Sequence, residues 1–361
     1  YRINKYDLDF GPGMSVEMDH NTYSLGATVS QPIYAGGQIY NNYKAAQVQG
    51  KITEQAEELT TDNIVYSADL NYWTAAARKG MYDVMCQYVD IVGELANVLT
   101  IRFNDGQISK TDLLQVESRL KEAELNKSSA YKEYQIALQN LNSLMGVSPL
   151  DPIEVEDSIT TYLALPLQVG EDVALRNRPD YAISELNIEY QKRQINLSKA
   201  KYNPSLAIGF QGTWGTPMLN VKGSDQLWTP AVFASLKIPL FRWGARFKEV
   251  NSQKAILRSK EYALDNTRDK IAQEVANAWT SLTEYTKQIT VAEEACKIAE
   301  ETLDLNTFSY NEGKLPILDV LSAQLSWIQS YSSLIQTRYQ QKASLAQYNK
   351  AICMPKLPRR N

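Results

Sequence analysis

The amino-acid sequence predicts a mainly α fold with β structure, in which long α-helical coiled-coil hairpins are combined with amphipathic strands. The chain contains an internal tandem duplication at a constant offset of 207 residues, which pairs Gly106 with Gly313 and Asp112 with Asp319. Between the turns of each copy the apolar residues follow a helical period, and beside these helices the period changes to two. These three observations define the predicted fold class.

The predicted strands are about ten residues long and have one apolar and one polar face. They are 21–34, 203–215 and 227–241. This length and alternation suit a transmembrane β-barrel, with lipid outside and water inside. Half-buried strands of soluble sheets have the same pattern, but the rest of the chain is coiled-coil helix that offers nothing to cover such a sheet. The context therefore favours the barrel.

Two long helices are predicted at 38–103 and 245–310, each near 100 Å at about 1.5 Å of rise per residue. The second carries an unbroken heptad seam, which predicts a left-handed coiled coil. Its members are Ile271, Val275, Ala278, Leu282, Tyr285, Ile289, Ala292, Cys296, Ala299 and Leu303. The equivalent positions of the first helix are Ile64, Ala68, Asn71, Ala75, Arg78, Tyr82, Met85, Val89, Val92 and Ala96. Because Asn71 and Arg78 interrupt that seam, the two helices are expected to have different neighbours.

The repeated polar turn marks the far tip of each helical hairpin, where the chain reverses. Gly106 and Gly313 suit the reversal because glycine tolerates positive φ at a helix end. In the first copy Ser109 and Asp112 have the spacing of a capping box. In the second copy Pro316 suits the first turn of the returning helix. Asp319 suits the positive end of the dipole of that helix.

The order of these elements predicts a domain organisation of two repeats around a linker. Residues 1–145 form the first repeat, with a strand pair, a descending helix, a tip and a return helix. Residues 146–170 form a proline-bearing equatorial linker on the outside of the helices. Residues 171–354 form the second repeat, which begins with an ascending helix of about 35 residues, and 355–361 form a tail. Tyr1 aligns with Ile208 under the same offset, so the chain is expected to lack its first ascending helix and part of its first strand.

Composition excludes several classes of function. The net charge of −4 is distributed without a basic stripe, so no nucleic-acid partner is expected. No run of about 18 apolar residues occurs, so no transmembrane helix is predicted. The three cysteines occupy non-equivalent positions in the two copies, and His20 is the single histidine. A catalytic, cofactor or metal site needs convergent His, Cys or carboxylate side chains, so an enzyme is not expected.

The ordered set of motifs resembles the TolC-like outer membrane efflux protein family over essentially the whole chain. The motifs are "QPIYAGG", "DGQISKTDLL", "RNRPDYAISELNIEY", "YNPSLAIGFQG", "KIPLFRWG" and "NEGKLPILDVL". The resemblance implies a homotrimer, in which four amphipathic strands from each protomer close a 12-stranded β-barrel. It also implies that the helices form a long periplasmic tunnel.

The same resemblance implies the outer-membrane exit duct of a tripartite efflux or secretion system in a Gram-negative bacterium. The duct would be a passive channel, without cofactor, that contacts outer-membrane lipid. Its implied partners are a periplasmic membrane-fusion adaptor and an inner-membrane transporter, expected to be of the RND type. A non-conducting coiled-coil stalk or adhesin on the cell surface stays open as the alternative, and ion conductance distinguishes the two.

The resemblance also implies a site at the tips, which would contact the adaptor and close the tunnel. The implied contact residues are Gly106, Gln107, Ile108, Ser109, Asp112, Gly313, Lys314, Leu315 and Asp319. The gate candidates are Asp319, Thr111, Asp112 and Tyr310, with Tyr310 expected as the polar partner of the other tip. Asp319 matches an aspartate that forms an acidic ring in some members, although Ser322 stands where those members have a second aspartate. Leu315 stands where the family has a gate-locking arginine, which argues against that latch.

Overall fold

The computed structural model describes residues 2–3, 8–9, 11–13, 15–17, 21–215 and 227–353. His20 and the predicted 355–361 tail lie outside the described residues. The chain divides into two compact units. The strand unit contains 1–53 and 184–264, and the tip unit contains 54–183 and 265–361. Each sequence repeat contributes strands to the first unit and a helical hairpin to the second.

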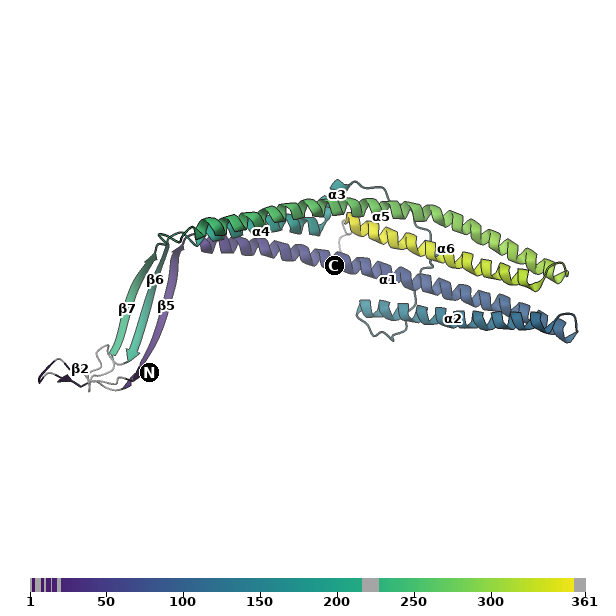
Figure 1. The fold of residues 1–361 in the computed structure, drawn as a ribbon, viewed down its shortest axis with the longest axis horizontal. Coiled ribbons are helices and arrows are strands. Elements are labelled where there is room, and N and C mark those ends of the chain that lie inside the picture. The colour runs from purple at the N-terminus through teal and green to yellow at the C-terminus, as the bar shows by residue number, and fades with distance from the viewer. Residues whose placement is uncertain are drawn as a thin grey trace. The chain divides into compact units, whose positions relative to one another are not determined.

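The strand unit contains a three-stranded antiparallel sheet in the order β5-β6-β7 (Figure 1). These strands are β5 (Ser24–Ala35), β6 (Ser205–Gly215) and β7 (Leu227–Lys237). The three strands for which the sequence predicted bounds are confirmed, but β7 is shorter than expected because Pro239 has no N–H to donate to a ladder. A fourth long strand is not present among the described residues. Four two-residue strands precede the sheet: β1 (Arg2–Ile3), β2 (Leu8–Asp9), β3 (Ser15–Val16) and β4 (Asn21–Thr22). Of the predicted first strand, the described part is β1, which pairs with β4.

The register of the sheet separates an apolar face from a polar face. On one face, cross-strand rows join Val29, Phe210 and Val232, and also Leu25, Trp214 and Trp228. On the other face, the rows join Thr28, Gln211 and Ala231, and also Ser30, Gly209 and Phe233. Val232 is 78% exposed and Leu25 is 75% exposed, so the apolar face has no cover within the described residues. The alternation predicted from the sequence is therefore confirmed.

Phe233 is the large aromatic side chain on the polar face. Its ring lies over Gly209 of the neighbouring strand, where an added Cβ would be 2.3 Å from Phe233 Cζ. Aromatic side chains that cover a glycine on an adjacent strand protect the exposed backbone there. Gly209 is therefore required for a close approach of ring to backbone.

Two helices of equal length continue from the sheet towards the tips. They are α1 (Gln38–Asn104) and α5 (Ala245–Asn311), with 67 residues each. Both agree with the predicted bounds to within one residue. The chain enters α1 through Gly36 and Gly37 and enters α5 through Gly244, all at positive φ. These glycines permit the sharp turn between strand and helix.

The return helices also match between the copies. They are α2 (Lys110–Met145) and α6 (Ile317–Ile352), with 36 residues each. The predicted ascending helix is instead two helices, α3 (Glu171–Asn177) and α4 (Pro179–Ala200). Arg178 between them is extended, with φ −78° and ψ 122°, because a residue before proline is disfavoured in the helical region. The prediction of a single ascending helix was therefore wrong.

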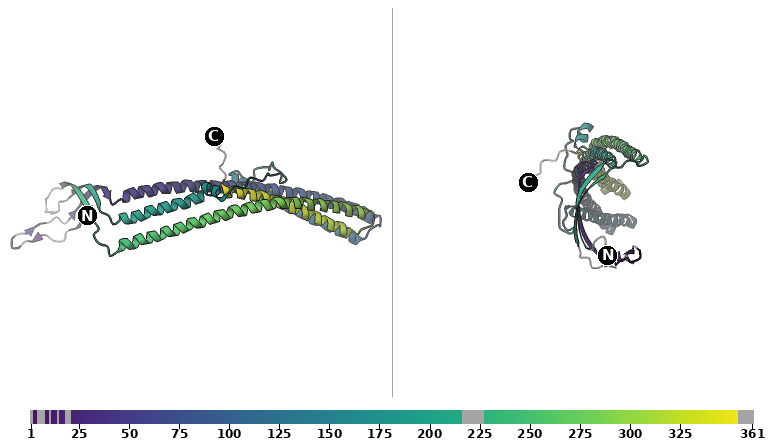
Figure 2. Two further views of the ribbon diagram at one scale, coloured as in Figure 1. Left: turned by 90° about the horizontal axis from the view of Figure 1, so that it is seen from above. Right: turned by 90° about the vertical axis from the view of Figure 1, so that its left-hand side faces the viewer.

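In the tip unit α2 lies beside α1 and α6 lies beside α5 (Figures 1 and 2). All four helices contribute to one hydrophobic core, in which the rings of Tyr88 and Trp327 stack at 6.5 Å. The α5 seam is confirmed. Its fully buried members are Ile271, Val275, Ala278, Leu282, Cys296, Ala299 and Leu303. Burial also raises the pKa of the Cys296 thiol, as expected for a small structural hydrophobe.

The predicted seam of α1 is only partly correct. Ala75, Val92 and Ala96 are buried, but Ile64 and Arg78 are exposed. The buried stripe nearer the tip is Val84, Tyr88, Val92, Leu95 and Leu99. This stripe is shifted from the predicted one because α1 contributes to a core shared with both α2 and α6. As expected, α1 and α5 have different neighbours, and α1 buries a wider face than the predicted seam.

The 146–170 linker has no helix or strand and packs against the helices of the tip unit, to which it belongs. Tyr72 Oη donates a hydrogen bond to Asp157 Oδ2 at 2.8 Å. The Lys342 ammonium donates to the Thr161 carbonyl and lies 4.5 Å from the centroid of the Trp73 ring. Ile159 of the linker is buried in the core. These contacts attach the linker to α1 and α6 together.

One helix within the described residues, α1, is long and apolar enough to cross a membrane by composition. Its most apolar 18-residue window has a mean hydropathy of 1.3 and is 33% buried in the structure. The sequence analysis, which looked for an uninterrupted apolar run, expected no such helix. Val92 and Leu99 of α1 lie in the core shared with the other three helices, and packing of this kind gives a helix an apolar composition without lipid.

Candidate functional site

The first tip reverses the chain at Gly106, which has φ 73°. The Gly106 N–H donates to the Phe103 carbonyl at 3.0 Å, and the Gln107 N–H donates to the Arg102 carbonyl at 2.8 Å. This pair of hydrogen bonds is a Schellman motif, which satisfies the last carbonyls of a helix. A residue with a Cβ is strained at this φ, so the glycine ends α1.

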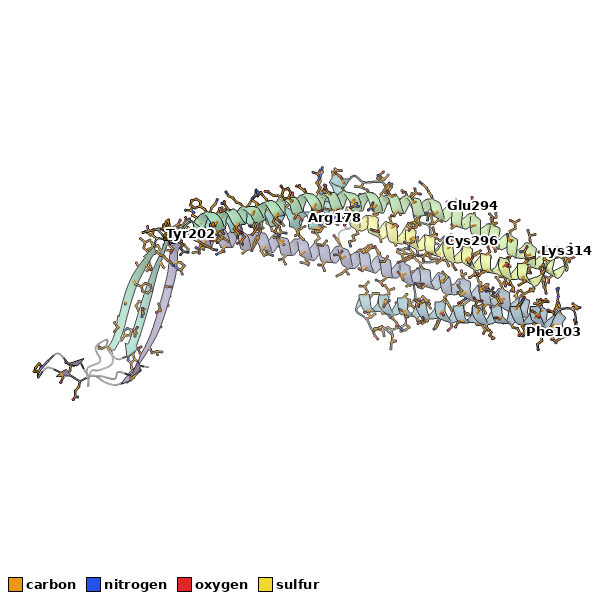
Figure 3. The ribbon with its side chains drawn as sticks, viewed as in Figure 1. Phe103, Arg178, Tyr202, Glu294, Cys296 and Lys314 are labelled. Carbon is orange, nitrogen blue, oxygen red and sulfur yellow. The ribbon has the colours of Figure 1, made fainter. Side chains whose placement is uncertain are left out.

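The second tip has the same geometry at the equivalent residues. Gly313 has φ 70°, its N–H donates to the Tyr310 carbonyl at 2.9 Å, and the Lys314 N–H donates to the Ser309 carbonyl at 2.9 Å. Phe103 and Lys314 lie at the two tips in Figure 3. The predicted reversal by a glycine in each copy is confirmed, and the duplication preserves the turn as well as its sequence.

The first return helix begins with a complete capping box. Ser109 Oγ accepts a hydrogen bond from the Asp112 N–H at 3.1 Å. In the other direction Asp112 Oδ2 accepts from the Ser109 N–H at 3.4 Å and from Ser109 Oγ at 2.9 Å. The predicted capping role of Asp112 is confirmed. Its carboxylate is thereby engaged within its own tip.

The second return helix begins without that box. Pro316 is the N-cap residue, with φ −74° and ψ 157°, one position before the expected first turn. Asp319 occupies the third helical position, equivalent to Asp112, but Pro316 has no N–H to donate to it. No hydrogen bond or ion pair of the Asp319 carboxylate is present among the described residues. A single residue difference between the copies therefore leaves the Asp319 carboxylate free.

The two tips are linked by Arg102, which the sequence analysis did not identify. Arg102 Nη2 donates to Asn311 Oδ1 at 3.0 Å, and the guanidinium lies 5.3 Å from the centroid of the Tyr310 ring. Tyr310 is 8% exposed, so this contact is a cation–π interaction at the edge of the core. Arg102 aligns with Ser309 under the offset. The sequence signal that could have identified Arg102 is that only one of the two copies has a basic residue at this position.

The remaining predicted site residues are placed around this link. Gln107, Thr111 and Lys314 are exposed, and Leu315 is half-buried. Ile108 packs against the core. The structure pairs Asp112 with Ser109 and Tyr310 with Arg102, so the expected pairing of Thr111 and Asp112 with Tyr310 was wrong within the protomer. The Asp112 carboxylate is held by Ser109, and the Tyr310 ring is covered by the Arg102 guanidinium.

The carboxylates of a single chain do not gather into a metal site within the part of the chain that the structure describes. Among the residues that the structure describes, no group of three or more His, Cys, Asp or Glu side chains is close enough to hold a metal ion. Asp319 contributes one free carboxylate to each chain.

Curated proteins match this chain in sequence, among them two bacterial proteins. Nodulation protein T of Rhizobium leguminosarum bv. trifolii is 24% identical over 238 residues, which are 64% of this chain and 50% of that protein. Outer membrane efflux protein BepC of Brucella suis is 20% identical over 320 residues, which are 88% of this chain and 69% of that protein. The chain thus spans half the length of the first relative and about two thirds of the second.

Solved structures show the same fold. The outer membrane protein VceC of Vibrio cholerae has a TM-score of 0.76 at 16% identity, covering 92% of this chain and 87% of VceC. CusC has a TM-score of 0.79 at 16% identity, covering 95% of this chain and 80% of CusC. The family model described as outer membrane efflux protein matches residues 13–147 and 172–352. This chain therefore belongs to the outer membrane efflux protein family, which places it in the outer membrane of a Gram-negative bacterium.

Proposed function

We propose that the protein is the outer-membrane exit duct of a tripartite efflux or secretion system, a passive channel that leads solutes to the exterior. The observation that carries the proposal is the sheet of the strand unit. Its apolar face is uncovered at Leu25, Val29 and Val232, while its other face is polar. A sheet with these two faces is stable where one face meets lipid and the other meets water.

The sheet also supports the proposal of a homotrimer. Three long strands cannot close a barrel by themselves, since small barrels need about eight strands. The outer edges of β5 and β7 are unpaired with any other described strand, and unpaired edges are templates for strands of another chain. Copies of the same chain supply such strands in a closed symmetric ring.

The helices supply a second surface for neighbouring copies. On α5, Val291, Ile298 and Leu305 are exposed at intervals of seven residues, on a different face from the buried seam. On α2, Leu114 and Leu125 are exposed as well. A heptad of exposed apolar residues is the pattern of a helix that packs on a further helix. These faces fit lateral packing between protomers.

At the tips we propose that the free Asp319 carboxylates of three protomers form an acidic ring. The box closed by Ser109 holds Asp112 in its own tip, whereas Pro316 leaves Asp319 available. A ring of carboxylates at a narrow opening selects and binds cations. The same tips are the proposed docking surface for the adaptor, with an inner-membrane transporter of the RND type behind it.

The experiment that tests the duct is single-channel recording on the purified protein in planar lipid bilayers, with its mass measured in detergent. A trimeric mass and discrete conductance steps are the expected result. The control is the same preparation after thermal unfolding, which should insert no channels. A correctly folded protein that never conducts would refute the duct and favour a coiled-coil stalk or adhesin.

A further inference from the structure

A hollow of about 400 Å³, lined by both polar and apolar residues, lies in the strand unit, where the strands meet the helices. Its lining residues on the polar face of the sheet are Pro32, Ala35, Ser205, Ala207, Ser235 and Lys237. Most of its sheet residues therefore lie on the side of the sheet that the proposed duct would expose to water, while Tyr34 and Leu206 of the other face also line it. Tyr202 marks this region in Figure 3.

Three cationic side chains line the hollow: Lys201, Lys237 and Arg242. Lys201 is neutralised, because its ammonium lies 2.5 Å from Glu249 Oε1. Glu249 also accepts a hydrogen bond from Tyr202 Oη at 2.9 Å, and the hydrogen bond from Lys201 is the main cause that lowers the pKa of this carboxyl group. The Glu249 carboxylate is thus already engaged.

Lys237 and Arg242 have no carboxylate partner within the part of the chain that the structure describes. Arg242 instead lies over the Tyr202 ring, 5.7 Å from its centroid, which holds the guanidinium at the rim. Two unneutralised cations in a chain of net charge −4 are a local reversal of the overall charge. Such a reversal raises the concentration of anions at the hollow.

The remaining lining groups add hydrogen-bond donors. Gln38 supplies a side-chain amide, and Ser205 and Ser235 supply hydroxyl groups. The Asn203 amide lines the hollow as well, but it already donates to the Gly36 carbonyl at 2.9 Å. Gln38 is also the first residue of α1, and neither α1 nor α5 has an acidic residue in its first turn. The positive ends of these two helix dipoles are therefore uncompensated by side chains and add to the field of the two cations.

We propose that this hollow binds the phosphate group of an anionic molecule, with Lys237 and Arg242 as its charged contacts. The planar guanidinium of Arg242 is suited to bidentate contact with phosphate, and Lys237 acts as a point charge. Two sources share this chemistry: a soluble phosphorylated solute on the polar face, or the headgroup of a phospholipid. This proposal rests on the proposed function in one respect, that the polar face of the sheet is in contact with water. The binding test below does not require the protein to conduct ions.

The test is isothermal titration calorimetry of inorganic pyrophosphate into the full chain, purified in a neutral detergent. Saturable binding that weakens with added salt is expected, since exposed charges are screened. The Lys237→Gln, Arg242→Gln double variant should bind about tenfold more weakly or worse, the effect of losing charge-assisted hydrogen bonds. Lys248→Gln is the matched control, because Lys248 is exposed near the start of α5 and does not line the hollow. Its affinity should stay within about twofold of wild type.

Native mass spectrometry of the same proteins distinguishes the two sources. Retention of phosphatidylglycerol by the wild type and its loss from the double variant would assign the site to a lipid headgroup. Equal lipid content together with weaker pyrophosphate binding would assign it to a soluble phosphorylated solute. Circular dichroism and the oligomeric mass confirm that the variants fold. Absence of saturable pyrophosphate binding, or equal affinity in all three proteins, would overturn the site even if the protein conducts ions.

Discussion

Arg102 at the end of α1 donates a hydrogen bond across the tip unit to Asn311 at the end of α5, with 3.0 Å between Nη2 and Oδ1. The two residues are 209 positions apart in the sequence, and each belongs to a different copy of the duplicated unit. With the Tyr310 ring below the guanidinium, this contact joins the two hairpins at the level where each one reverses.

If the tips close the tunnel, as the family resemblance implies, Arg102→Ala is expected to loosen the closed state, because the contact between the two hairpins is lost. A cation–π contact of this exposure contributes roughly 0.5–1 kcal/mol, so the open-to-closed ratio should rise about two- to fivefold. Single-channel recording measures this as a higher open fraction. Arg102→Lys keeps the charge but loses the planar stacking, so its open fraction should lie between those of the wild type and Arg102→Ala. Lys110→Ala, which removes an exposed cation of the same tip, should leave the open fraction unchanged. An equal effect of Lys110→Ala would show a general charge effect instead of a link.

Asp319→Asn is expected to relieve block of the channel by divalent or trivalent cations, because the proposed ring loses its charge. Pro316→Ser should weaken the block as well, since it restores an N–H and a hydroxyl that can hold Asp319 in a capping box. The blocking concentration is read from bilayer currents.

Asp112→Asn is the control at the equivalent position of the other copy. It should cost up to about 1 kcal/mol of stability through the loss of charge at a helix N-terminus and leave the block unchanged. A blocking concentration that does not respond to Asp319→Asn would remove the acidic ring and leave Asp319 as a helix-dipole partner.

Gly106→Trp is expected to abolish efflux without preventing insertion, if the tips dock an adaptor. No atom lies within 4 Å of a Cβ placed at Gly106, so the indole would project outward from the tip. Gly106→Asn is the matched control, because asparagine tolerates positive φ and adds little bulk. Solute tolerance of cells and the amount of protein in the outer membrane are measured together. Normal tolerance with the tryptophan variant would argue against docking at this surface.

Gly209→Val is expected to destabilise the sheet by roughly 1–3 kcal/mol, as overpacking does, because the new side chain meets the Phe233 ring. Adding Phe233→Ala to the same chain should restore part of the loss. Gly26→Ala on β5 is the control, since its Cβ would have an ordinary contact of 3.5 Å with Thr213 Oγ1. Thermal unfolding in detergent reports all three. The close approach would be unimportant if the double variant were no more stable than Gly209→Val.

Lys342 should make stability depend on pH above neutrality. Burial lowers the pKa of its ammonium below the ordinary 10.5, so in the window between the two values the unfolded chain holds more protons than the folded one. Stability then rises with pH through this window. Below the folded pKa the full cost of burying the charge is present.

The comparison that isolates this term is wild type against Lys342→Met, with urea unfolding followed from pH 7 to 10. The wild type should gain stability relative to the variant as the pH rises. Lys350→Met, which removes a half-buried lysine over the Tyr66 ring, controls for the loss of a cation beside an aromatic ring. A difference between wild type and Lys342→Met that is constant with pH would contradict the assignment.

The elements that the sequence predicted well are those governed by local signals. The ends of α1 and α5 follow from glycines that the duplication repeats, and the strands follow from their period of two. The break at Pro179 was also a local signal, yet the helical pattern on both sides concealed it. The capping box of Ser109 and Asp112 needed only the spacing of two residues.

The features that escaped prediction depend on neighbours that are distant in sequence. The buried stripe of α1 is determined by its packing against both α2 and α6. A prediction from one heptad pattern therefore placed the stripe on the wrong residues. Arg102 could not be matched with Asn311, because nothing along the chain connects one tip to the other. The freedom of the Asp319 carboxylate is instead a local effect of the missing N–H of Pro316, and it becomes apparent once the N-cap position is known. The residues of the phosphate hollow come from three separate segments, 32–38, 201–207 and 235–242.

The equal lengths of α1 and α5 constrain how this protein can change in evolution. Because Arg102 and Asn311 meet only if both helices end at the same height, a one-turn insertion in a single copy would displace one tip by about 5.4 Å and separate them. The same insertion in both copies would lengthen the periplasmic reach and keep the contact. Natural variation in reach between envelopes of different depth should therefore occur as paired insertions or deletions, one in each half of the gene.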